Sequence, residues 1–165
     1  MVLRSIWVLL FASAGLFADG MFMADKVIIK KSTRMLYLSS GGEIFQKYHV
    51  SLGQVPVGAK EVEGDMKTPE GAYRLDWRQN SNQYYKSLHI SYPNKKDKSH
   101  AKSLGQSAGG MIMIHGTPPS WSLSPYGDWM NVFIDWTQGC ISMSNDDIDD
   151  VWEQTQNGTT VVIVP

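Results

Sequence analysis

Residues 135–145 read DWTQGCISMSN and contain the only cysteine of a 165-residue chain. Cys140 directly follows a glycine, lies among small hydroxyl and amide side chains, and precedes an acidic segment that can start a helix. A tight turn with backbone N–H groups around a lone thiol suits a nucleophile. The alternative is a buried free cysteine that serves as a small apolar side chain. The stretch alone does not decide between the two.

The segment after the cysteine predicts the one helix of the fold. Ser144 or Asn145 can cap its first turn, and Asp146 and Asp147 suit the positive end of a helix dipole. The Asn-Gly pair at residues 157–158 ends it, because glycine readily takes the left-handed conformation that follows helices. Apolar and small side chains recur on one face at helical spacing, at Ile148, Val151, Trp152 and Thr155.

The rest of the chain reads as short strands separated by turns. A serine and glycine turn at residues 39–42 joins two apolar stretches and predicts a hairpin. The polar segment 94–110, rich in glycine, serine and lysine, is expected to be a loop or flap. Many strands with one late helix predict a mainly β domain. The expected strands cover residues 26–30, 34–38, 43–52, 72–77, 87–92, 111–114 and 159–164.

The N-terminal residues 1–18 have the pattern of a secretory signal peptide. Arg4 precedes a short apolar run, and Ala14 and Ala18 each end a small-residue cleavage pattern. The run is shorter than the roughly 20 apolar residues that cross a bilayer, so no stable membrane span is expected. Residues 25–165 are then expected to form a single domain. With 15 Lys and Arg against 16 Asp and Glu, the chain lacks the basic excess that attracts nucleic acid.

A cysteine nucleophile needs a base, and histidine is its usual partner. His115 ends the apolar run 111–114 and precedes a glycine, which places it at the mouth of a sheet. His49 and His89 lie in predicted strands, where a histidine satisfied within the sheet is the simpler interpretation. His100 lies in the polar segment and is expected to be solvated. None of the four shows metal-ligand spacing, so no metal is expected. These residues predict a Cys–His acyl-transfer site.

The spacing of these residues resembles a known family. Ile114-His115-Gly116, followed by residues 137–141 (TQGCI), is similar to the signature of the L,D-transpeptidase (YkuD) catalytic domain, a histidine followed by a Ser/Thr-x-Gly-Cys turn. Upstream, residues 31–38, 48–53 and 67–73 are also similar to this family, so the resemblance covers nearly all of the chain after residue 25. Three further stretches resemble its YafK-type branch: residues 63–65 (EGD), 91–94 (SYPN) and 135–145.

The resemblance implies a β-sandwich or barrel and a periplasmic enzyme that acts on peptidoglycan stem peptides without a cofactor. Cys140 would attack the diaminopimelate carbonyl, and the terminal D-alanine would leave. His115 would be the base, and the Gly116 carbonyl would orient its imidazole. Backbone amides of Gly139 and Cys140 would stabilise the oxyanion.

The fate of the thioester is left open by the sequence. An acceptor amine gives transfer, whereas water gives hydrolysis as a carboxypeptidase or amidase. The YafK-type branch is associated with cleaving a covalently attached lipoprotein from peptidoglycan, so such a lipoprotein is a candidate partner. A non-catalytic peptidoglycan-binding module is an alternative of another class. The lone exported thiol argues against that module, because a retired site would not need it.

Several positions depart from the family pattern or are candidates for substrate contact. Gln138 replaces a histidine that many members have, and Ser142 replaces an arginine or asparagine. Residues 117–134 (Thr117 to Ile134) lengthen the interval between histidine and cysteine. Aromatic residues in this insert either pack against the domain or form a lid over the acceptor site; they are Trp121, Tyr126, Trp129 and Phe133. The candidate substrate contacts, with turn or packing roles as the alternative, are Glu63, Asp65, Tyr92, Gln138 and Ser142.

Overall fold

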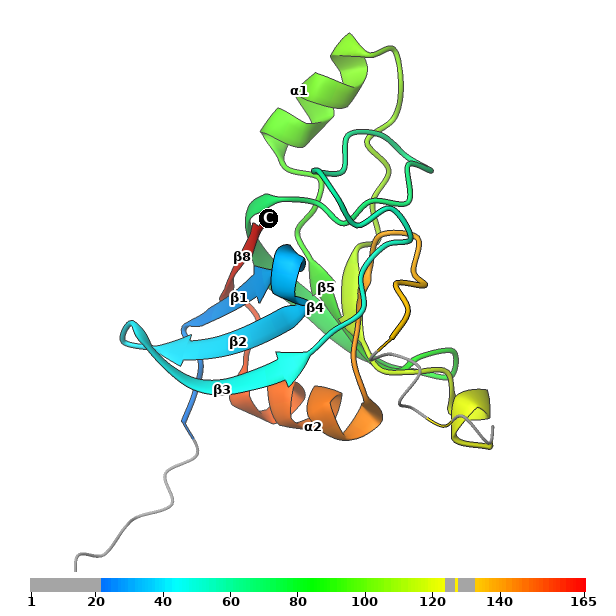
Figure 1. Ribbon diagram of the computed structural model, residues 1–165. Helices are drawn as coiled ribbons and strands as arrows, with labels where there is room; N and C mark the ends of the chain where they lie inside the picture. The colour runs from blue at the N-terminus through cyan, green and yellow to red at the C-terminus, as the bar shows by residue number, and fades with distance from the viewer. Residues whose placement is uncertain (1–21, 124–126, 128–132) are drawn as a thin grey trace, which may run out of the picture.

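The computed structural model describes residues 22–123, 127 and 133–165 of the chain (Figure 1). The expected signal peptide at residues 1–18 lies outside these residues. Within the described ranges, no helix combines the length and the apolar character needed to cross a membrane.

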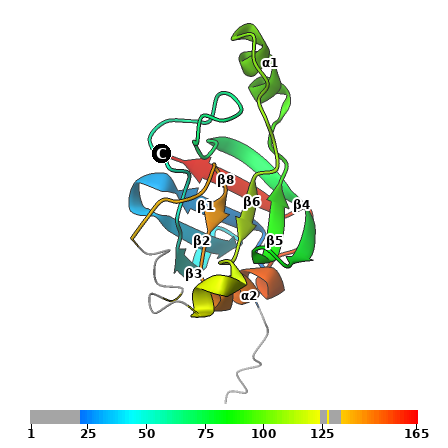
Figure 2. The same cartoon turned by 90° about the vertical axis from the view of Figure 1, so that its right-hand side faces the viewer.

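In the part of the chain that the structure describes, eight strands form one sheet in the order β3-β2-β1-β8-β4-β5-β6-β7 (Figures 1 and 2). The pairs β1–β8 and β6–β7 are parallel, and the other neighbours are antiparallel. The strands are β1 Lys26–Lys30, β2 Met35–Ser40, β3 Glu43–His49, β4 Gly71–Ser81, β5 Tyr85–Ile90, β6 Met113–His115, β7 Ile141–Ser142 and β8 Thr160–Val164. The helices are α1 Lys95–Ser103 and α2 Asn145–Gln154, with short 3-10 turns η1 Lys31–Thr33 and η2 Pro119–Leu123.

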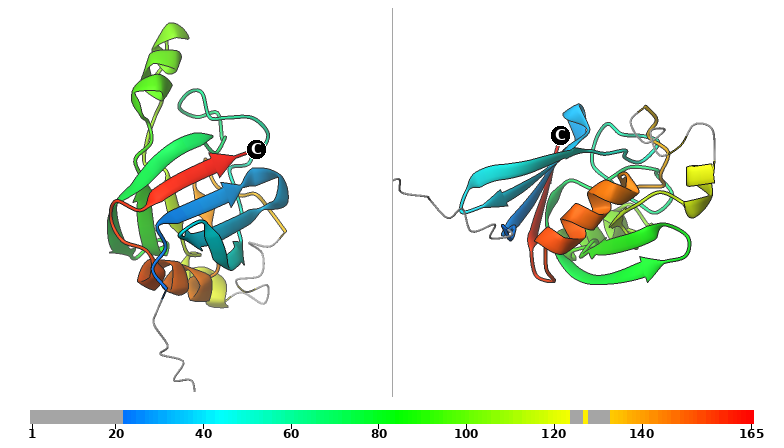
Figure 3. Two further views of the ribbon diagram at one scale, coloured as in Figure 1. Left: turned by 90° about the vertical axis from the view of Figure 1, so that its left-hand side faces the viewer. Right: turned by 90° about the horizontal axis from the view of Figure 1, so that it is seen from below.

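The long strand β4 folds the sheet over on itself. Its first four residues pair with β8, and its later residues pair with β5. The register shifts between Leu75 and Trp77, and such a bulge bends a strand and increases its twist. The sheet therefore has two halves that face each other across the core (Figure 3). Backbone hydrogen bonds of 2.8 and 2.9 Å between Ser51 and Ser142 join the two ends of the sheet. The expectation of a mainly β sandwich or barrel is confirmed.

The core follows from the alternation of the strand sequences. In β1, Val27 and Ile29 point inward, and in β8, Val161 and Ile163 do the same. Helix α2 closes one open end of the folded sheet (Figure 3, right). It buries Ile148 and Val151 of the predicted apolar face. Burying these branched side chains stabilises the fold by about 1.5 to 3 kcal/mol each.

Helix α2 begins and ends close to where the sequence predicted. Ser144 is the N-cap, and its hydroxyl accepts the backbone N–H of Asp147 at 3.1 Å. The helix ends at Gln154, and the turn at residues 157–158 leads into β8. Of the predicted face, Trp152 is half-buried against the core, and Thr155 is the buried C-cap.

The expectation of a loop or flap at residues 94–110 is wrong in part, because α1 lies within it. Asn94 caps this helix by accepting the N–H groups of Lys96 and Asp97 at 2.8 and 3.1 Å. Asp97 in turn accepts the N–H of Asn94 at 2.9 Å, which completes a capping box. Only Ala101 is buried, so α1 has no apolar stripe that hydrophobic periodicity could detect. It stands away from the sheet at the top of Figure 1.

The apolar run at residues 111–114 was expected to be a buried strand, and its first half is not. Strand β6 begins only at Met113. Met111 is 62% exposed and has a left-handed backbone conformation with φ of 56°. The chain turns at this residue beside the cysteine, which leaves a shorter strand that ends on His115.

Candidate active site

The turn that carries the cysteine is held by its own threonine. Thr137 donates its hydroxyl hydrogen bond to the Cys140 carbonyl at 2.7 Å, and its Oγ1 accepts the Gly139 N–H at 3.1 Å. Gly139 has φ of +133°, and a Cβ there would lie 2.7 Å from the Lys67 carbonyl oxygen. Only glycine therefore fits this position. The turn is tied to the neighbouring segment by a hydrogen bond of 3.2 Å from the Thr137 N–H to the Leu52 carbonyl.

An ion pair anchors the start of this turn to the sheet. Arg34 donates from Nε to both carboxylate oxygens of Asp135 at 3.0 Å and from Nη2 to one of them at 2.6 Å. The Leu52 N–H adds a hydrogen bond of 2.9 Å to the same carboxylate. Bidentate arginine–carboxylate pairs fix geometry as well as adding energy. Three segments distant in sequence are thus joined just before the cysteine.

His115 is buried at the end of β6, and its imidazole is held in one orientation. Nδ1 donates to the carbonyl oxygen of Gly116 at 2.7 Å, which leaves Nε2 free to accept a proton. A Cβ at Gly116 would collide with Oδ1 of Asn145, and this oxygen accepts the Thr117 N–H at 2.9 Å. Burial lowers the pKa of His115 to about 4, although its hydrogen bond to Gly116 raises it slightly. The imidazole is therefore neutral at pH 7.

The thiol of Cys140 is neutral as well. Its sulfur donates to the Met111 carbonyl oxygen at 3.5 Å. Burial raises the pKa of Cys140, while a backbone hydrogen bond from Met113 and the positive charge of Lys60 partly offset this effect. With a neutral thiol and a neutral imidazole, the reaction calls for proton transfer between them, rather than an ion pair formed in advance.

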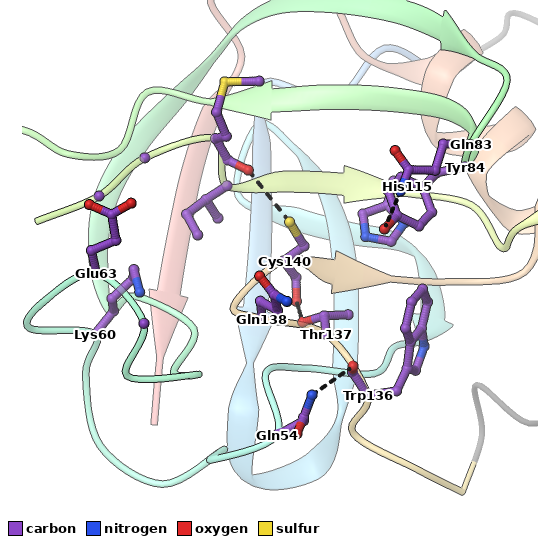
Figure 4. Close-up of a pocket in the computed structure, with 15 residues that line it drawn as sticks. Gln54, Lys60, Glu63, Gln83, Tyr84, His115, Trp136, Thr137, Gln138 and Cys140 are labelled. Carbon is purple, nitrogen blue, oxygen red and sulfur yellow. Dashed lines mark hydrogen bonds between the residues drawn. The ribbon is translucent and has the colours of Figure 1, made fainter.

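Cys140 and His115 line one cavity of about 570 Å³, as their predicted pairing requires (Figure 4). On the His115 side the wall is aromatic. The Tyr84 ring lies 4.5 Å from the imidazole centroid and the Trp136 ring 5.7 Å from it. Trp121 packs on Trp136 at 4.8 Å. The charged residues Lys60 and Glu63 lie on the other side of the sulfur. Of the amides in the wall, Gln138 lies next to Cys140, Gln83 lies next to Tyr84, and Gln54 lies farther from the sulfur, below Trp136 in the view of Figure 4.

Two of the five candidate substrate contacts, Glu63 and Gln138, line this cavity, and three do not. Asp65 accepts the Lys60 ammonium at 2.8 Å and three backbone N–H groups, so its carboxylate organises the loop. Tyr92 is buried and donates its hydroxyl to the Ala108 carbonyl at 3.0 Å. Ser142 is fully buried within β7. The interpretation of these three as substrate contacts is wrong, because none faces the cavity.

The oxyanion role expected for Gly139 also needs correction. Its N–H points to the hydroxyl of Thr137, and the residue is absent from the cavity wall. Gly139 serves the turn through its backbone conformation instead. That the backbone N–H of Cys140 donates to the oxyanion stays a prediction.

The other three histidines lie outside the cavity wall. The Nδ1 atom of His89 lies 2.6 Å from the Asp76 carboxylate, as expected of a histidine satisfied in a sheet. His100 is exposed on α1 and contacts Glu61 at 3.2 Å. His49 differs from its expected role, because its Nδ1 is buried with no hydrogen-bond partner among the described residues.

The insert at residues 117–134 is described only in part. Trp121 packs against Trp136 of the cavity wall, whereas Phe133 is 72% exposed. Tyr126 and Trp129 lie outside the described residues. Trp121 therefore packs against the domain, which is one of the two roles expected for these aromatic residues. That residues 117–134 form a lid over the acceptor site stays a prediction.

Sequence reasoning missed much of the cavity wall. The missed residues come from loops and a hairpin turn, where neither periodicity nor spacing marks a site-facing side chain. Tyr84 ends the β4–β5 turn, and a tyrosine in a hairpin has no local sign of facing a histidine far along the chain. The missed residues are Gln54, Lys60, Gln83, Tyr84, Trp136 and residues 109–112.

Removing the Thr137 hydroxyl is expected to loosen the cysteine turn. Thr137→Val keeps the shape but leaves the Gly139 N–H and the Cys140 carbonyl without this partner, which costs about 1 to 3 kcal/mol of stability. We expect alkylation of Cys140 by iodoacetamide, timed by intact mass, to change in rate. Thr159→Val is the matched control, because Thr159 is also buried and accepts a loop N–H at 3.1 Å, but does not line the cavity. Equal alkylation rates in both variants would contradict a positioning role.

The buried neutral imidazole of His115 makes stability depend on pH. Its pKa is about 4 when folded and about 6.5 when unfolded, so between these values the unfolded chain binds a proton that the folded chain does not. Stability is therefore lost as the pH falls through this window, by about 2 to 3 kcal/mol between pH 7 and pH 4.5. Urea unfolding at both pH values, compared with His115→Gln, isolates this contribution. The prediction fails if both proteins lose the same stability.

Comparisons with known proteins agree with this geometry. Residues 24–163 match the family model of the L,D-transpeptidase catalytic domain, YkuD. Over 132 residues the chain is 26% identical to YafK of Escherichia coli strain K12, a match that covers 78% of this chain and 45% of that protein. The crystal structure of the helical cell shape determining protein Pgp2 from Campylobacter jejuni matches at a TM-score of 0.63 and 27% identity, over 84% of this chain and 46% of that chain. An L,D-transpeptidase from Mycobacterium smegmatis has the same fold, with a TM-score of 0.55 at 12% identity, over 85% and 58% of the two chains. The chain thus spans about half the length of these relatives.

Proposed function

The chain belongs to the L,D-transpeptidase (YkuD) catalytic domain family, and we propose that it is a cysteine-dependent acyltransferase acting on peptidoglycan stem peptides. One observation carries the proposal. Cys140 and His115 line the same cavity, and the imidazole keeps Nε2 free because Nδ1 is bound to the Gly116 carbonyl. A binding module would need neither a thiol in the cavity wall nor an oriented base. Residues 25–165 would form the single catalytic domain.

The reaction begins when Nε2 of His115 takes the thiol proton. The Cys140 thiol exchanges its bond to the Met111 carbonyl for one to the imidazole, and its sulfur attacks the diaminopimelate carbonyl. The Cys140 N–H stabilises the oxyanion in this proposal. The imidazolium then gives its proton to the leaving D-alanine amine, and a thioester remains. An acceptor amine attacks this thioester, loses its proton to His115, and releases the thiol.

Hydrolysis on the same site is the alternative outcome of the second step. Water in place of the amine gives a carboxypeptidase that trims stems, or an amidase that releases a lipoprotein from peptidoglycan. The aromatic wall formed by Tyr84 and Trp136, with Trp121 packed on Trp136, favours transfer, because it lies beside the base and limits the space open to water. We place the enzyme in the periplasm, where residues 1–18 would direct it as a signal peptide.

Digestion of purified muropeptides tests the proposal directly. The protein is incubated with tetrapeptide muropeptides and with peptidoglycan that carries bound lipoprotein, and the products are identified by mass. New cross-links support transfer, shortened stems identify a carboxypeptidase, and a released lipoprotein peptide identifies an amidase. Binding to peptidoglycan without any product, by a protein whose thiol titrates normally, would overturn the enzymatic proposal in favour of the binding module.

A further inference from the structure

The position of His115 fixes which side of the cavity each part of a substrate occupies. The leaving or accepting amine exchanges its proton with Nε2, so it must lie on the His115 side, against Tyr84 and Trp136. The acyl group attached to the Cys140 sulfur then extends to the opposite side. Among the described residues of the cavity wall, Glu63 and Lys60 carry the charged side chains, and both lie on that side (Figure 4).

Glu63 presents an unpaired carboxylate to the cavity. Among the described residues, no lysine, arginine or histidine lies within 4.0 Å of it. Its backbone is held by a hydrogen bond of 2.8 Å from its N–H to the Ser107 carbonyl. Gly109 allows this close approach, since a Cβ there would lie 3.2 Å from the Glu63 Cβ. The two loops that form this end of the cavity therefore hold the backbone of Glu63 in place and leave its carboxylate without a neutralising partner among the described residues.

Lys60 is a buried cation at the same end. Its side chain is only 4% exposed, and its Nζ donates to the Asp65 carboxylate at 2.8 Å and to the Val62 carbonyl at 3.0 Å. An ammonium has three N–H donors, so one remains beyond these two. Because Lys60 lines the cavity, a ligand there can take the third donor.

We propose that Glu63 and Lys60 form a subsite for a zwitterionic amino-acid head group on the acyl donor. Glu63 binds the ammonium of this group, and the third donor of Lys60 binds its carboxylate. The inference rests on the proposed function, because the side chain of a diaminopimelate residue ends in such a head group. It also narrows the donor: a stem whose side-chain amine is already acylated loses its charge and cannot pair with Glu63.

Three synthetic tetrapeptide donors test the subsite. They carry diaminopimelate, lysine without the side-chain carboxylate, or aminopimelate without the side-chain amine. We expect the wild-type enzyme to have a KM about 10 to 100 times higher for the aminopimelate donor than for the diaminopimelate donor, as the loss of a charge-assisted contact predicts. For the lysine donor, we expect a smaller increase in KM relative to the diaminopimelate donor. Glu63→Gln should raise KM for both donors with an amine by a similar factor, leave kcat nearly unchanged, and have no effect on the aminopimelate donor.

Glu61→Gln is the matched control, because Glu61 lies in the same loop but contacts His100 and Lys67 outside this cavity wall. The role of Lys60 is tested with the lysine donor, which lacks the carboxylate that Lys60 would bind. Lys60 itself is not substituted, because its hydrogen bonds to Asp65 and Val62 hold the loop. If Glu63→Gln weakens all three donors equally, or none, the subsite is wrong while the enzymatic proposal stands. If the wild-type protein turns over no donor, the proposed function fails as well.

Discussion

Replacing Cys140 with alanine is expected to abolish formation of an acyl-enzyme and to lower turnover of stem peptides by at least about 10⁴-fold. The sulfur is the sole nucleophile in the proposed reaction, and removing the nucleophile of a serine protease costs about 10⁶-fold in kcat. Intact mass after incubation with a carbapenem reports the covalent step, and muropeptide turnover reports the whole reaction. The wild-type mass should rise by one adduct, and the variant mass should not change.

The variant must stay folded for this result to count. Cys140 is half-buried, and its sulfur makes one long hydrogen bond of 3.5 Å, so the free energy of unfolding should fall by no more than about 1 kcal/mol. Urea unfolding measures that change. An adduct on Cys140→Ala would show that another residue is acylated and would remove the basis for assigning the nucleophile.

The parts of the fold that the sequence predicted are those with a local physical cause. The apolar face of α2 and its Ser144 cap lie within about ten residues of each other in the sequence. In the strands, apolar and polar residues alternate, or apolar residues follow one another, over five or six residues. Helix α1 has equally local capping by Asn94 and Asp97, yet it was missed because only Ala101 is buried. A solvated polar helix and a polar loop have the same hydrophobic pattern.

The site divides in the same way. His115 and Cys140 could be identified because chemistry restricts which residues can be a base and a nucleophile. The substrate contacts could not, because facing the cavity is a property of loop geometry. Asp65 and Glu63 are two residues apart, but one carboxylate is taken up by loop N–H groups and the other faces the cavity. No local rule separates them.

Replacing His115 with glutamine is expected to slow acylation by about 10²- to 10⁴-fold at pH 7, the usual effect of losing a general base. The pH dependence is more informative than the size of the loss. The pKa of the wild-type imidazole is about 4, so the base is neutral from about pH 5 upward and acylation should be nearly independent of pH from 6 to 8. Without the base, only the thiolate reacts, and burial raises the pKa of Cys140 above its ordinary value of 9.0. The rate of the variant should therefore rise about tenfold per pH unit from 6 to 8.

Stopped-time mass measurement of carbapenem acylation at pH 6, 7 and 8 gives both profiles. His89→Gln is the control, because it removes a histidine of the sheet that contacts Asp76 and does not line the cavity. It should keep the flat wild-type profile and nearly the full rate. A flat profile for His115→Gln would mean that the thiol loses its proton to some other group. The assignment of His115 as the base rests on its free Nε2. If the profile is flat, that assignment fails, and the imidazole is only a part of the cavity wall.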